Sequence, residues 1–300
     1  MKNTLVTVFT PAYNRAKTLP RVFECLKSQT YRNFEWIIID DGSSDNTKEV
    51  CEAFLSEKTD FEITYRYQTN KGKHVATNVA AALAKGDFII TLDSDDSCKP
   101  EAIETFIKQW NRLDESQKKK YKGISCRTCD KNGKLNGERL SSEYIDCSDL
   151  DLRFKYKVKG ELWGMVRTDI VKANPYPEIE GLHFYPENIY WDEIGRKYTT
   201  RFVDIPLRYY INDQNIALTD KRNSSSKETF FMRVHFVNDC WDYFKYDRKF
   251  FIKSIVGLSR DGLFSGKKFK EITGIPNSFF KKFLTVSLFP LGWLLYVTKH

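Results

Sequence analysis

Short runs of apolar, mostly β-branched or aromatic residues alternate with amphipathic segments through the first hundred residues. The runs predict strands, at Leu5–Thr10, Glu35–Ile39, Ile63–Tyr67 and Phe88–Leu92. The segments between them predict helices, at about Thr18–Gln29, from Ser44 or Asp45 to about Ser56, and at about Val75–Ala84. Pro11 is expected to end the first strand. This alternation is typical of parallel strands joined by crossover helices, so we expect an α/β protein.

Polar side chains follow three of these strands directly. The clusters are Thr10–Arg15, Asp40–Asp45 and Asp93–Asp96. Ligands of open α/β sheets bind outside the carboxyl ends of the strands. We therefore expect the three clusters to meet in one crevice.

The cluster Asp93-Ser94-Asp95-Asp96 is the most informative of the three. Mg²⁺ and Mn²⁺ prefer carboxylate oxygens and usually take one or two from protein while a bound phosphate group supplies others. An Asp-x-Asp at a strand end suits that demand, and the chain turns there, so both carboxylates can face one metal ion. The alternative is an Asp-rich turn that caps a helix starting near Pro100.

The other clusters supply groups that suit a nucleotide. A carboxylate of Asp40 or Asp41 can accept from a base N–H or a ribose hydroxyl, although the same segment also reads as a strand-to-helix turn with a good cap. Tyr13 can stack on a base, with the cation Arg15 beside it. The segment Asn70–His74 adds cations that can meet phosphate, and His74 itself is either a donor contact or a structural residue.

In order along the chain, these motifs resemble those of the family 2 glycosyltransferases with the GT-A fold, from about Leu5 to at least Leu207. The motifs are Thr-Pro-Ala-Tyr-Asn-Arg from Thr10, Ile-Ile-Ile-Asp-Asp-Gly-Ser-Ser-Asp-Asn-Thr from Ile37, Lys-Gly-Lys-His from Lys71 with Asn78, and Ala-Lys-Gly-Asp-Phe-Ile-Ile-Thr-Leu-Asp-Ser-Asp-Asp from Ala84. The resemblance implies a Rossmann-like, mixed but mostly parallel sheet flanked by helices. It also implies inverting transfer of a sugar from a nucleotide donor to a hydroxyl.

The resemblance also assigns roles to single residues. Nucleoside contacts fall to Pro11, Tyr13 and Asp41, supported by Asp40, whereas Lys73 helps to hold the donor. The full set expected to bind the donor is Pro11, Tyr13, Arg15, Asp40, Asp41, Lys73, Asn78, Asp93 and Ser94. Asp93 and Asp95 are the expected metal ligands, with Asp93 near the ribose or the metal and Asp95 on the metal of the donor diphosphate. Thr77 stands where the family often has Arg, so a donor contact from that position is absent or replaced.

Inverting displacement needs a base that takes the proton of the acceptor hydroxyl. By the resemblance, the base lies on a loop that enters a helix, and here Glu187 is the first choice and Asp192 the second, although the family's usual Glu-Asp pair is not intact. Glu187 can also be a first-turn carboxylate that interacts with the helix dipole. Glu161 and Trp163 are expected to contact the acceptor, with ordinary core packing as the alternative for Trp163. His183 is a further residue that could approach the metal.

The second half of the chain is less regular. A hairpin turn is expected at Lys131–Lys134, a helix at about Ile189–Lys197 and a strand at Arg201–Ile205. The expected organisation is a catalytic domain over residues 1–222, with a donor half (1–98) and an acceptor half (99–222). A helical C-terminal region over residues 223–300 follows it.

The C-terminal segment 279–297 includes a largely apolar stretch of fifteen residues, Phe283–Val297, interrupted by Pro290. It is short of the roughly 20 residues that span a bilayer. Lys281 and Lys282 precede it, and it carries Trp293 and Tyr296, which favour the headgroup region. We expect an anchor at the membrane interface that brings the site to a lipid-linked acceptor; the alternative is a helix packed on the protein.

The composition narrows the setting. A net charge of +8 on 300 residues is compatible with phosphate-rich ligands, nucleic acid or anionic membranes and names none of them. The seven cysteines have no disulfide spacing, and Cys126 and Cys129 have no second pair with which to build a zinc site, so free thiols are expected. The expected setting is the cytoplasm or the inner face of the cell membrane.

The expected function is therefore a Mn²⁺- or Mg²⁺-dependent transferase that uses a UDP-sugar and a glycan or lipid-linked acceptor in surface polysaccharide synthesis, without a nucleic-acid partner. Two alternatives stay open: a non-catalytic, membrane-associated nucleotide-binding module, and a nucleotidyltransferase. The latter usually has a Gly-rich basic loop after the first strand, which Thr10–Arg15 lacks.

Overall fold

A computed structural model describes residues 4–179, 182, 184–211 and 226–298. The chain divides into two compact units. The first comprises Met1–Asp149, Val158–His183 and Ile194–Asn215, and the second comprises Leu150–Lys157, Phe184–Glu193 and Ile216–His300. Two short segments from within the expected acceptor half thus group with the C-terminal helices. Leu150 and Phe154 explain the first of these, because they are buried in one apolar cluster with Phe236 and Phe251.

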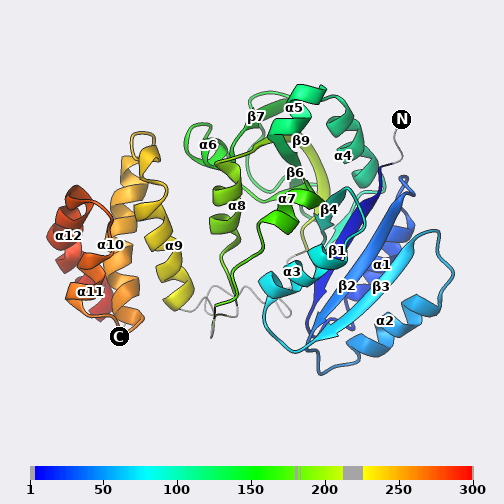
Figure 1. Cartoon of the computed structure of the whole chain (residues 1–300), viewed down its shortest axis with the longest axis horizontal. Coiled ribbons are helices and arrows are strands. Elements are labelled where there is room, and N and C mark those ends of the chain that lie inside the picture. The colour runs from blue at the N-terminus through cyan, green and yellow to red at the C-terminus, as the bar shows by residue number, and fades with distance from the viewer. Residues whose placement is uncertain (1–3, 180–181, 183, 212–225, 299–300) are drawn as a thin grey trace. The chain divides into compact units, whose positions relative to one another are not determined.

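A mixed sheet forms the centre of the first unit (Figure 1). Its order is β3-β2-β1-β4-β8-β6-β9-β5, with β7 paired to β9. The strands are β1 Val6–Ala12, β2 Phe34–Asp41, β3 Glu62–Gln68, β4 Phe88–Thr91, β5 Ser97–Cys98, β6 Tyr121–Cys129, β7 Tyr144–Cys147, β8 Leu162–Arg167 and β9 Thr199–Tyr209. Strands β3, β2, β1 and β4 are parallel, as is the pair of β6 and β9, whereas β8 runs antiparallel to both β4 and β6. The sequence-based expectation of a mixed α/β sheet with a largely parallel N-terminal half is confirmed.

Helices cover both faces of the parallel strands. Trp36 and Ile38 of β2 pack in one cluster with α1 (Leu19–Lys27), α2 (Thr47–Ser56) and α4 (Ala102–Asn111). Ile37 and Ile39 face the opposite way and pack with α3 (Lys73–Leu83) and with Val171 of α7 (Thr168–Ala173). Successive side chains of a strand point to opposite faces, so a strand covered on both sides is apolar throughout. The unit also contains α5 (Glu115–Lys120).

Pro11 does not end the first strand. β1 runs on to Ala12, with Pro11 opposite Ile39 of β2. The Phe9 carbonyl accepts from the Leu92 N–H, so the backbone N–H and C=O of Phe9 face β4. The backbone of Pro11, two residues later, faces the same side. The paired register with β4 ends at Phe9. The N–H that Pro11 lacks would therefore face a side with no remaining strand partner, which removes the usual cost of proline in a sheet.

Three other elements differ in extent from the expectation. α3 begins two residues early, at Lys73, because Gly72 adopts a φ of 94° at its start. α8 covers Glu187–Gly195 and follows Pro186 directly. β9 reaches Tyr209, because β5 and β6 both pair with its last residues, and this support cannot be predicted from the residues of β9 alone. The expected turn at Lys131–Lys134 is present, closed by the Asp130 N–H bonded to the Lys134 carbonyl.

The second unit is helical. Its elements include α9 Ser226–Asn238, a 3-10 turn at Trp241–Tyr243, α10 Arg248–Phe264, α11 Phe269–Gly274 and α12 Phe279–Val297. It also contains α6 (Asp149–Phe154) except for its first residue, and α8 as far as Glu193. Gly292 brings α12 close to α10, because a Cβ there would lie 2.5 Å from the Ser259 Cβ. α12 continues through Pro290 as one helix of 19 residues. By length and composition it could cross a membrane.

Candidate functional site

The acidic segment after β4 is held by two cations from distant parts of the chain. The Lys73 Nζ lies 2.7 Å from Asp93 Oδ1, and the Arg208 Nη2 lies 2.6 Å from Asp93 Oδ2. Burial by itself would raise the pKa of Asp93, but Lys73 and Arg208 outweigh it and hold that pKa well below its usual range. Asp93 is therefore ionised at neutral pH.

Arg208 also fixes Asp96. Its Nε lies 2.6 Å from Asp96 Oδ2, and the other oxygen of Asp96 accepts from the Ile211 N–H at 2.9 Å. Burial raises the pKa of Asp96 to about 6 even with Arg208 beside it, so this carboxyl is mostly ionised at neutral pH. Arg208 was not among the residues expected at the site, since it lies beyond the predicted end of its strand. A charged residue between Leu207 and two tyrosines was the only local signal.

Asp95 is engaged differently from its neighbours. Its side chain is 26% exposed, and the Arg15 Nη2 approaches it at 3.8 Å. Its backbone carbonyl accepts from Arg21. Among the carboxylates of this segment in the described chain, Asp95 is thus the one whose oxygens are least occupied by close protein contacts.

The Asp40-Asp41 turn positions the loop before α3. Both Asp41 oxygens accept hydrogen bonds at 2.8 Å, one from the Gln68 side chain and the Lys71 N–H and the other from the Gly72 N–H. Asp40 accepts from the Ser43 N–H at 2.9 Å and the Tyr65 hydroxyl at 2.8 Å. Burial, and then Asp40, raise the pKa of Tyr65 well above its usual value.

Through this loop the two acidic clusters are linked. Asp41 binds Gly72, the next residue is Lys73, and Lys73 reaches Asp93. Fixing the start of α3 therefore fixes the cation that faces the acidic segment. The contact of Asp41 with a nucleoside stays a prediction.

The cluster Thr10–Arg15 is hydrogen-bonded to the cluster Asp40–Asp45. Asn14 adopts a φ of 54°, which asparagine tolerates better than most residues, and its side-chain oxygen accepts from the Ser44 N–H at 2.8 Å. The Arg15 N–H donates to the Thr47 hydroxyl at 2.8 Å. Pro11 and Tyr13 are half-buried on the same segment. All three strand-end clusters are thus joined by direct contacts.

Asn78, which was expected to bind the nucleotide-sugar donor, and its neighbour Thr77 have partners inside the first unit. The Asn78 side chain exchanges two hydrogen bonds with the backbone of Tyr176, at 2.9 and 2.8 Å. The Thr77 hydroxyl donates to the Lys73 carbonyl. Ser94 is buried within the acidic segment, and His74 is buried with its ring edge-on to Tyr176. Asn78 thus ties α3 to the segment around Tyr176.

The expectation that Trp163 stacks on an acceptor sugar does not fit its position. Trp163 is 4% exposed, its indole N–H donates to the Thr91 carbonyl at 2.6 Å, and its ring packs edge-to-face on Phe106. Core packing, the alternative, describes it. Glu161, in contrast, is exposed just before β8. Burial, and then Glu161 and Asp96, raise the pKa of Tyr210, so Glu161 and Asp96 each lie near Tyr210.

The two candidate bases lie on α8, in the segment that belongs to the second unit. Glu187 is half-buried in the first turn. Asp192 is 1% exposed and accepts from the Arg153 Nη1 at 2.8 Å. The role of either as a base stays a prediction, and His183 lies outside the described residues.

Comparison with solved structures supports this architecture. Residues 1–349 of TarS from S. aureus superpose with a TM-score of 0.59 over 98% of this chain and 92% of that one, at 16% identity. Mannosyltransferase PcManGT from Pyrobaculum calidifontis gives a TM-score of 0.54 over 97% of this chain and 86% of that one, at 14% identity. At such identities the likeness concerns the fold, and the expected GT-A fold is confirmed.

Sequence comparison concerns the N-terminal part. Glycosyltransferase GlyG of Streptococcus pneumoniae is 40% identical over 111 residues, which are 37% of this chain and 36% of GlyG. Chondroitin synthase of Escherichia coli is 34% identical over 108 residues, 36% of this chain and 16% of that protein. The matched region thus spans well under two thirds of either relative. Residues 7–134, the region that contains all three strand-end clusters, match the family described as glycosyl transferase family 2.

Proposed function

We propose that the protein is an inverting, metal-dependent glycosyltransferase that moves a sugar from a nucleotide donor to a hydroxyl of an acceptor. The observation that carries this proposal is the acidic segment Asp93–Asp96, which is bonded to Lys73 and Arg208 and linked through Gly72 to Asp41. Lys73 and Arg208 hold the segment in place, and Lys73 would also help to hold the donor.

The carboxylate oxygens of the acidic segment suit Mn²⁺ or Mg²⁺ as metal ligands. Asp95 offers carboxylate oxygens that are little used by protein, and Asp93 is held ionised beside it. A metal bound there would stabilise negative charge on the departing nucleoside diphosphate. Pro11, Tyr13 and Arg15 would surround the nucleoside, and Asp40 and Asp41 would keep the adjoining loops in place. Asn78 and Ser94 would support the donor site from α3 and the acidic segment.

Glu187 is the proposed base. Asp192, the second choice, is almost fully buried and one of its oxygens already accepts from Arg153. A base must reach the acceptor hydroxyl, so the more accessible Glu187 is favoured. Glu161 is the remaining candidate for an acceptor contact.

A UDP-sugar is the proposed donor, and a glycan or lipid-linked glycan is the proposed acceptor. TarS has been solved in complexes with UDP and with UDP-GlcNAc, and PcManGT with GDP-Man and Mn²⁺. Chondroitin synthase, whose name denotes polysaccharide synthesis, is among the relatives. These similarities support a role in surface polysaccharide synthesis, and the cytoplasmic side of the membrane is the proposed location.

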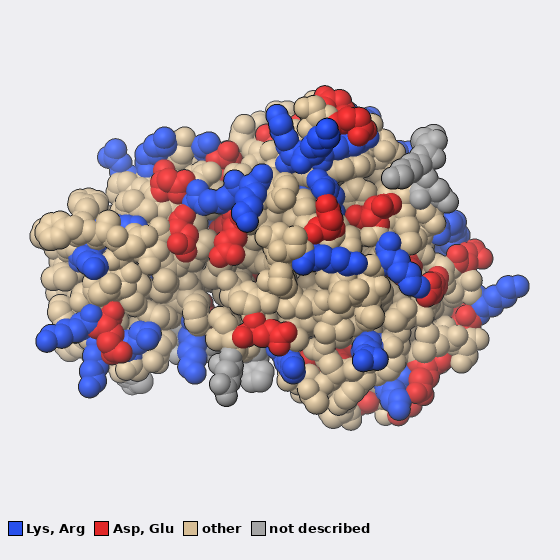
Figure 2. Space-filling view, viewed as in Figure 1, with Lys and Arg blue, Asp and Glu red and all other residues tan. Residues whose placement is uncertain are grey.

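α12 is the proposed membrane contact. Its exposed apolar side chains are Phe279, Phe280, Phe283, Val286, Leu291, Trp293, Leu294, Leu295 and Val297. Figure 2 shows a largely uncharged surface over α12, at the left of the view, with a few charged side chains within it and around it. One expected cation is not available, because Lys281 is 5% exposed and donates to the Val237 carbonyl at 2.9 Å. Lys282 is exposed and keeps the expected role.

Thermal unfolding with UDP, GDP and nucleotide sugars, each with and without Mn²⁺, tests the donor site. A ligand at about 100 times its Kd stabilises the folded state by about 2.7 kcal/mol. We expect UDP with Mn²⁺ to give such a shift, Asp95→Asn to lose it, and Asp60→Asn, an exposed carboxylate on a different loop, to keep it. Equal shifts in both variants would contradict the assignment of Asp95.

Release of UDP from the preferred donor, measured with candidate acceptors, then separates the alternatives. Nucleotide binding without transfer to any acceptor would favour the non-catalytic module. Release of pyrophosphate from a nucleoside triphosphate would favour a nucleotidyltransferase.

A further inference from the structure

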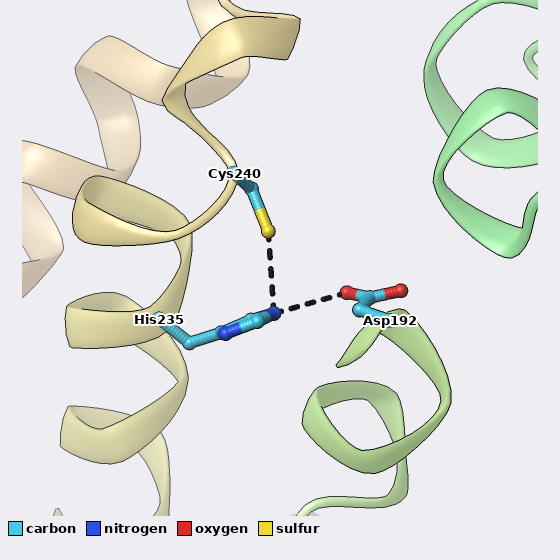
Figure 3. A group of neighbouring side chains, drawn as sticks. All are labelled: Asp192, His235 and Cys240. Atoms are coloured by element: carbon cyan, nitrogen blue, oxygen red, sulfur yellow. Dashed lines mark hydrogen bonds and ion pairs between the residues drawn. The ribbon is translucent and has the colours of Figure 1, made fainter. Parts of the chain in front are cut away.

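The second unit contains a group of metal-ligating side chains that the proposed transferase chemistry, with Glu187 as the base, does not use. We propose that Asp192, His235 and Cys240 bind a zinc ion (Figure 3). Asp192 lies on α8, His235 on α9, and Cys240 just after α9. The three ligands thus come from two segments of the chain that are far apart in the sequence.

The distances suit a tetrahedral ion. The His235 Nε2 lies 3.2 Å from the Asp192 Oδ2 and 3.2 Å from the Cys240 Sγ, and all three ligand atoms lie within 4.8 Å of one another. Zinc bonds of about 2.0–2.1 Å to N or O and about 2.3 Å to S place tetrahedral ligand atoms roughly 3.4–3.6 Å apart. Small side-chain movements would therefore admit the ion. One oxygen, one nitrogen and one sulfur ligand form a set that suits zinc better than Mg²⁺ or Ca²⁺.

A carboxylate held near His235 prepares the imidazole for a metal. The Asp239 Oδ2 lies 3.1 Å from the His235 Nδ1. If the Nδ1–H donates to Asp239, the Nε2 of a neutral ring carries a lone pair, as in many zinc sites where a carboxylate orients the histidine. That lone pair then faces an oxygen of Asp192, which is also an acceptor. Either a cation between the two atoms or the other tautomer, in which the Nε2–H donates to Asp192, resolves this contact.

Burial and charge favour the cation. Asp192, His235 and Cys240 are 1%, 4% and 0% exposed. Asp192 Oδ2 faces both Arg153 and His235, while its buried Oδ1 has no hydrogen-bond partner among the described residues. A rotated carboxylate could give one oxygen to the metal and the other to Arg153. With Cys240 as thiolate, the buried Asp192 carboxylate and the thiolate carry two negative charges, which Zn²⁺ would offset together with Arg153.

Zinc would join the segment that contains α8 to the C-terminal helices, and the proposal does not depend on the transferase chemistry. The test is the metal content of the full chain, purified without chelators or a metal-affinity tag. We expect about one zinc per chain, measured by elemental mass spectrometry. Cys240→Ala should lose it, whereas Cys51→Ala, which removes an equally buried thiol from the first unit, should retain it. Asp95→Asn should also retain it, which separates this site from the proposed donor metal.

Replacement of zinc by Co²⁺ in the unaltered protein gives a second readout that does not depend on the folding of a variant. Thiolate coordination should produce a sulfur-to-cobalt charge-transfer band, and that band should be absent from Cys240→Ala. The proposal is overturned if the purified protein holds no zinc and added Zn²⁺ does not raise its Tm. Equal zinc loss from Cys51→Ala, or a cobalt spectrum without the charge-transfer band, would also overturn it. In each of these cases an Nε2–H of His235 that donates to Asp192 would explain the contact.

Discussion

The guanidinium of Arg208 lies 2.6 Å from the carboxylate of Asp93, across a sequence separation of 115 residues. Because Arg208 also bonds Asp96, one side chain on β9 sets the conformation of the segment that follows β4. The acidic motif is therefore held by the C-terminal part of the sheet, and its geometry depends on β9 being in place.

Replacing Arg208 should destabilise the protein strongly. Arg208→Ala would leave Asp93 and the buried Asp96 without their shared cation, and loss of one partner of a buried pair typically costs about 3–5 kcal/mol. Arg208→Lys should cost less, because it keeps the charge but not the two-pronged geometry. Urea unfolding of both variants measures this. A change below about 0.5 kcal/mol for Arg208→Ala would show that the contacts do not hold the segment.

Asp41 should act through the loop that it binds. Asp41→Asn keeps one oxygen acceptor and turns the other into a donor, so either the Gly72 N–H or the pair from Gln68 and Lys71 loses its partner. An unsatisfied buried group costs about 1–3 kcal/mol. We expect that loss in urea unfolding, together with weaker binding of UDP and Mn²⁺. Gln68→Ala, which removes only one of the three bonds, serves as the milder comparison. If Asp41→Asn weakened nucleotide binding at unchanged stability, Asp41 would instead contact the nucleoside directly.

Glu187 should affect turnover and leave nucleotide binding intact. General-base catalysis typically contributes about 10²–10⁴-fold, so Glu187→Gln should lower kcat by a factor in that range while the Kd for UDP stays the same. Asp192→Asn should instead lower the Tm, since Asp192 is buried with Arg153. Parallel measurements of UDP release and UDP binding distinguish the two. Full activity in Glu187→Gln with none in a folded Asp192→Asn would reverse the assignment.

α12 should bind lipid surfaces through its apolar face. Burying a leucine side chain contributes about 1.5–3 kcal/mol, so Leu294→Glu should weaken binding to phosphatidylglycerol vesicles by about tenfold or more. Ser287→Glu adds the same charge at an exposed polar position of the same helix and should have a smaller effect. Vesicle sedimentation measures both. If neither the unaltered protein nor Ser287→Glu pelleted with vesicles, the membrane contact would be contradicted, and the exposed face of α12 would instead be a protein-binding surface.

Local patterns in the sequence determined the alternation of strands and helices and the three polar strand ends. Ile37, Ile38 and Ile39 predict a strand buried on both faces, and parallel neighbours must end at one edge, so the clusters after Thr10, Ile39 and Leu92 were bound to converge. The acidic motif and the Asp40-Asp41 turn could be identified for the same reason, since each occupies a few consecutive residues.

Tertiary structure alone decided which partners these residues acquire. Arg208 reaches Asp93 because β9 joins the sheet, Trp163 is buried because Phe106 and Thr91 pack on it, and Lys281 is removed from the surface by Val237. Asp192, His235 and Cys240 are likewise brought together by helix packing and have no motif spacing. Hydrophobic periodicity indicates the secondary structure of a segment and which of its faces is buried. The contacts above join residues far apart in the chain, so they depend on how the helices and strands pack together.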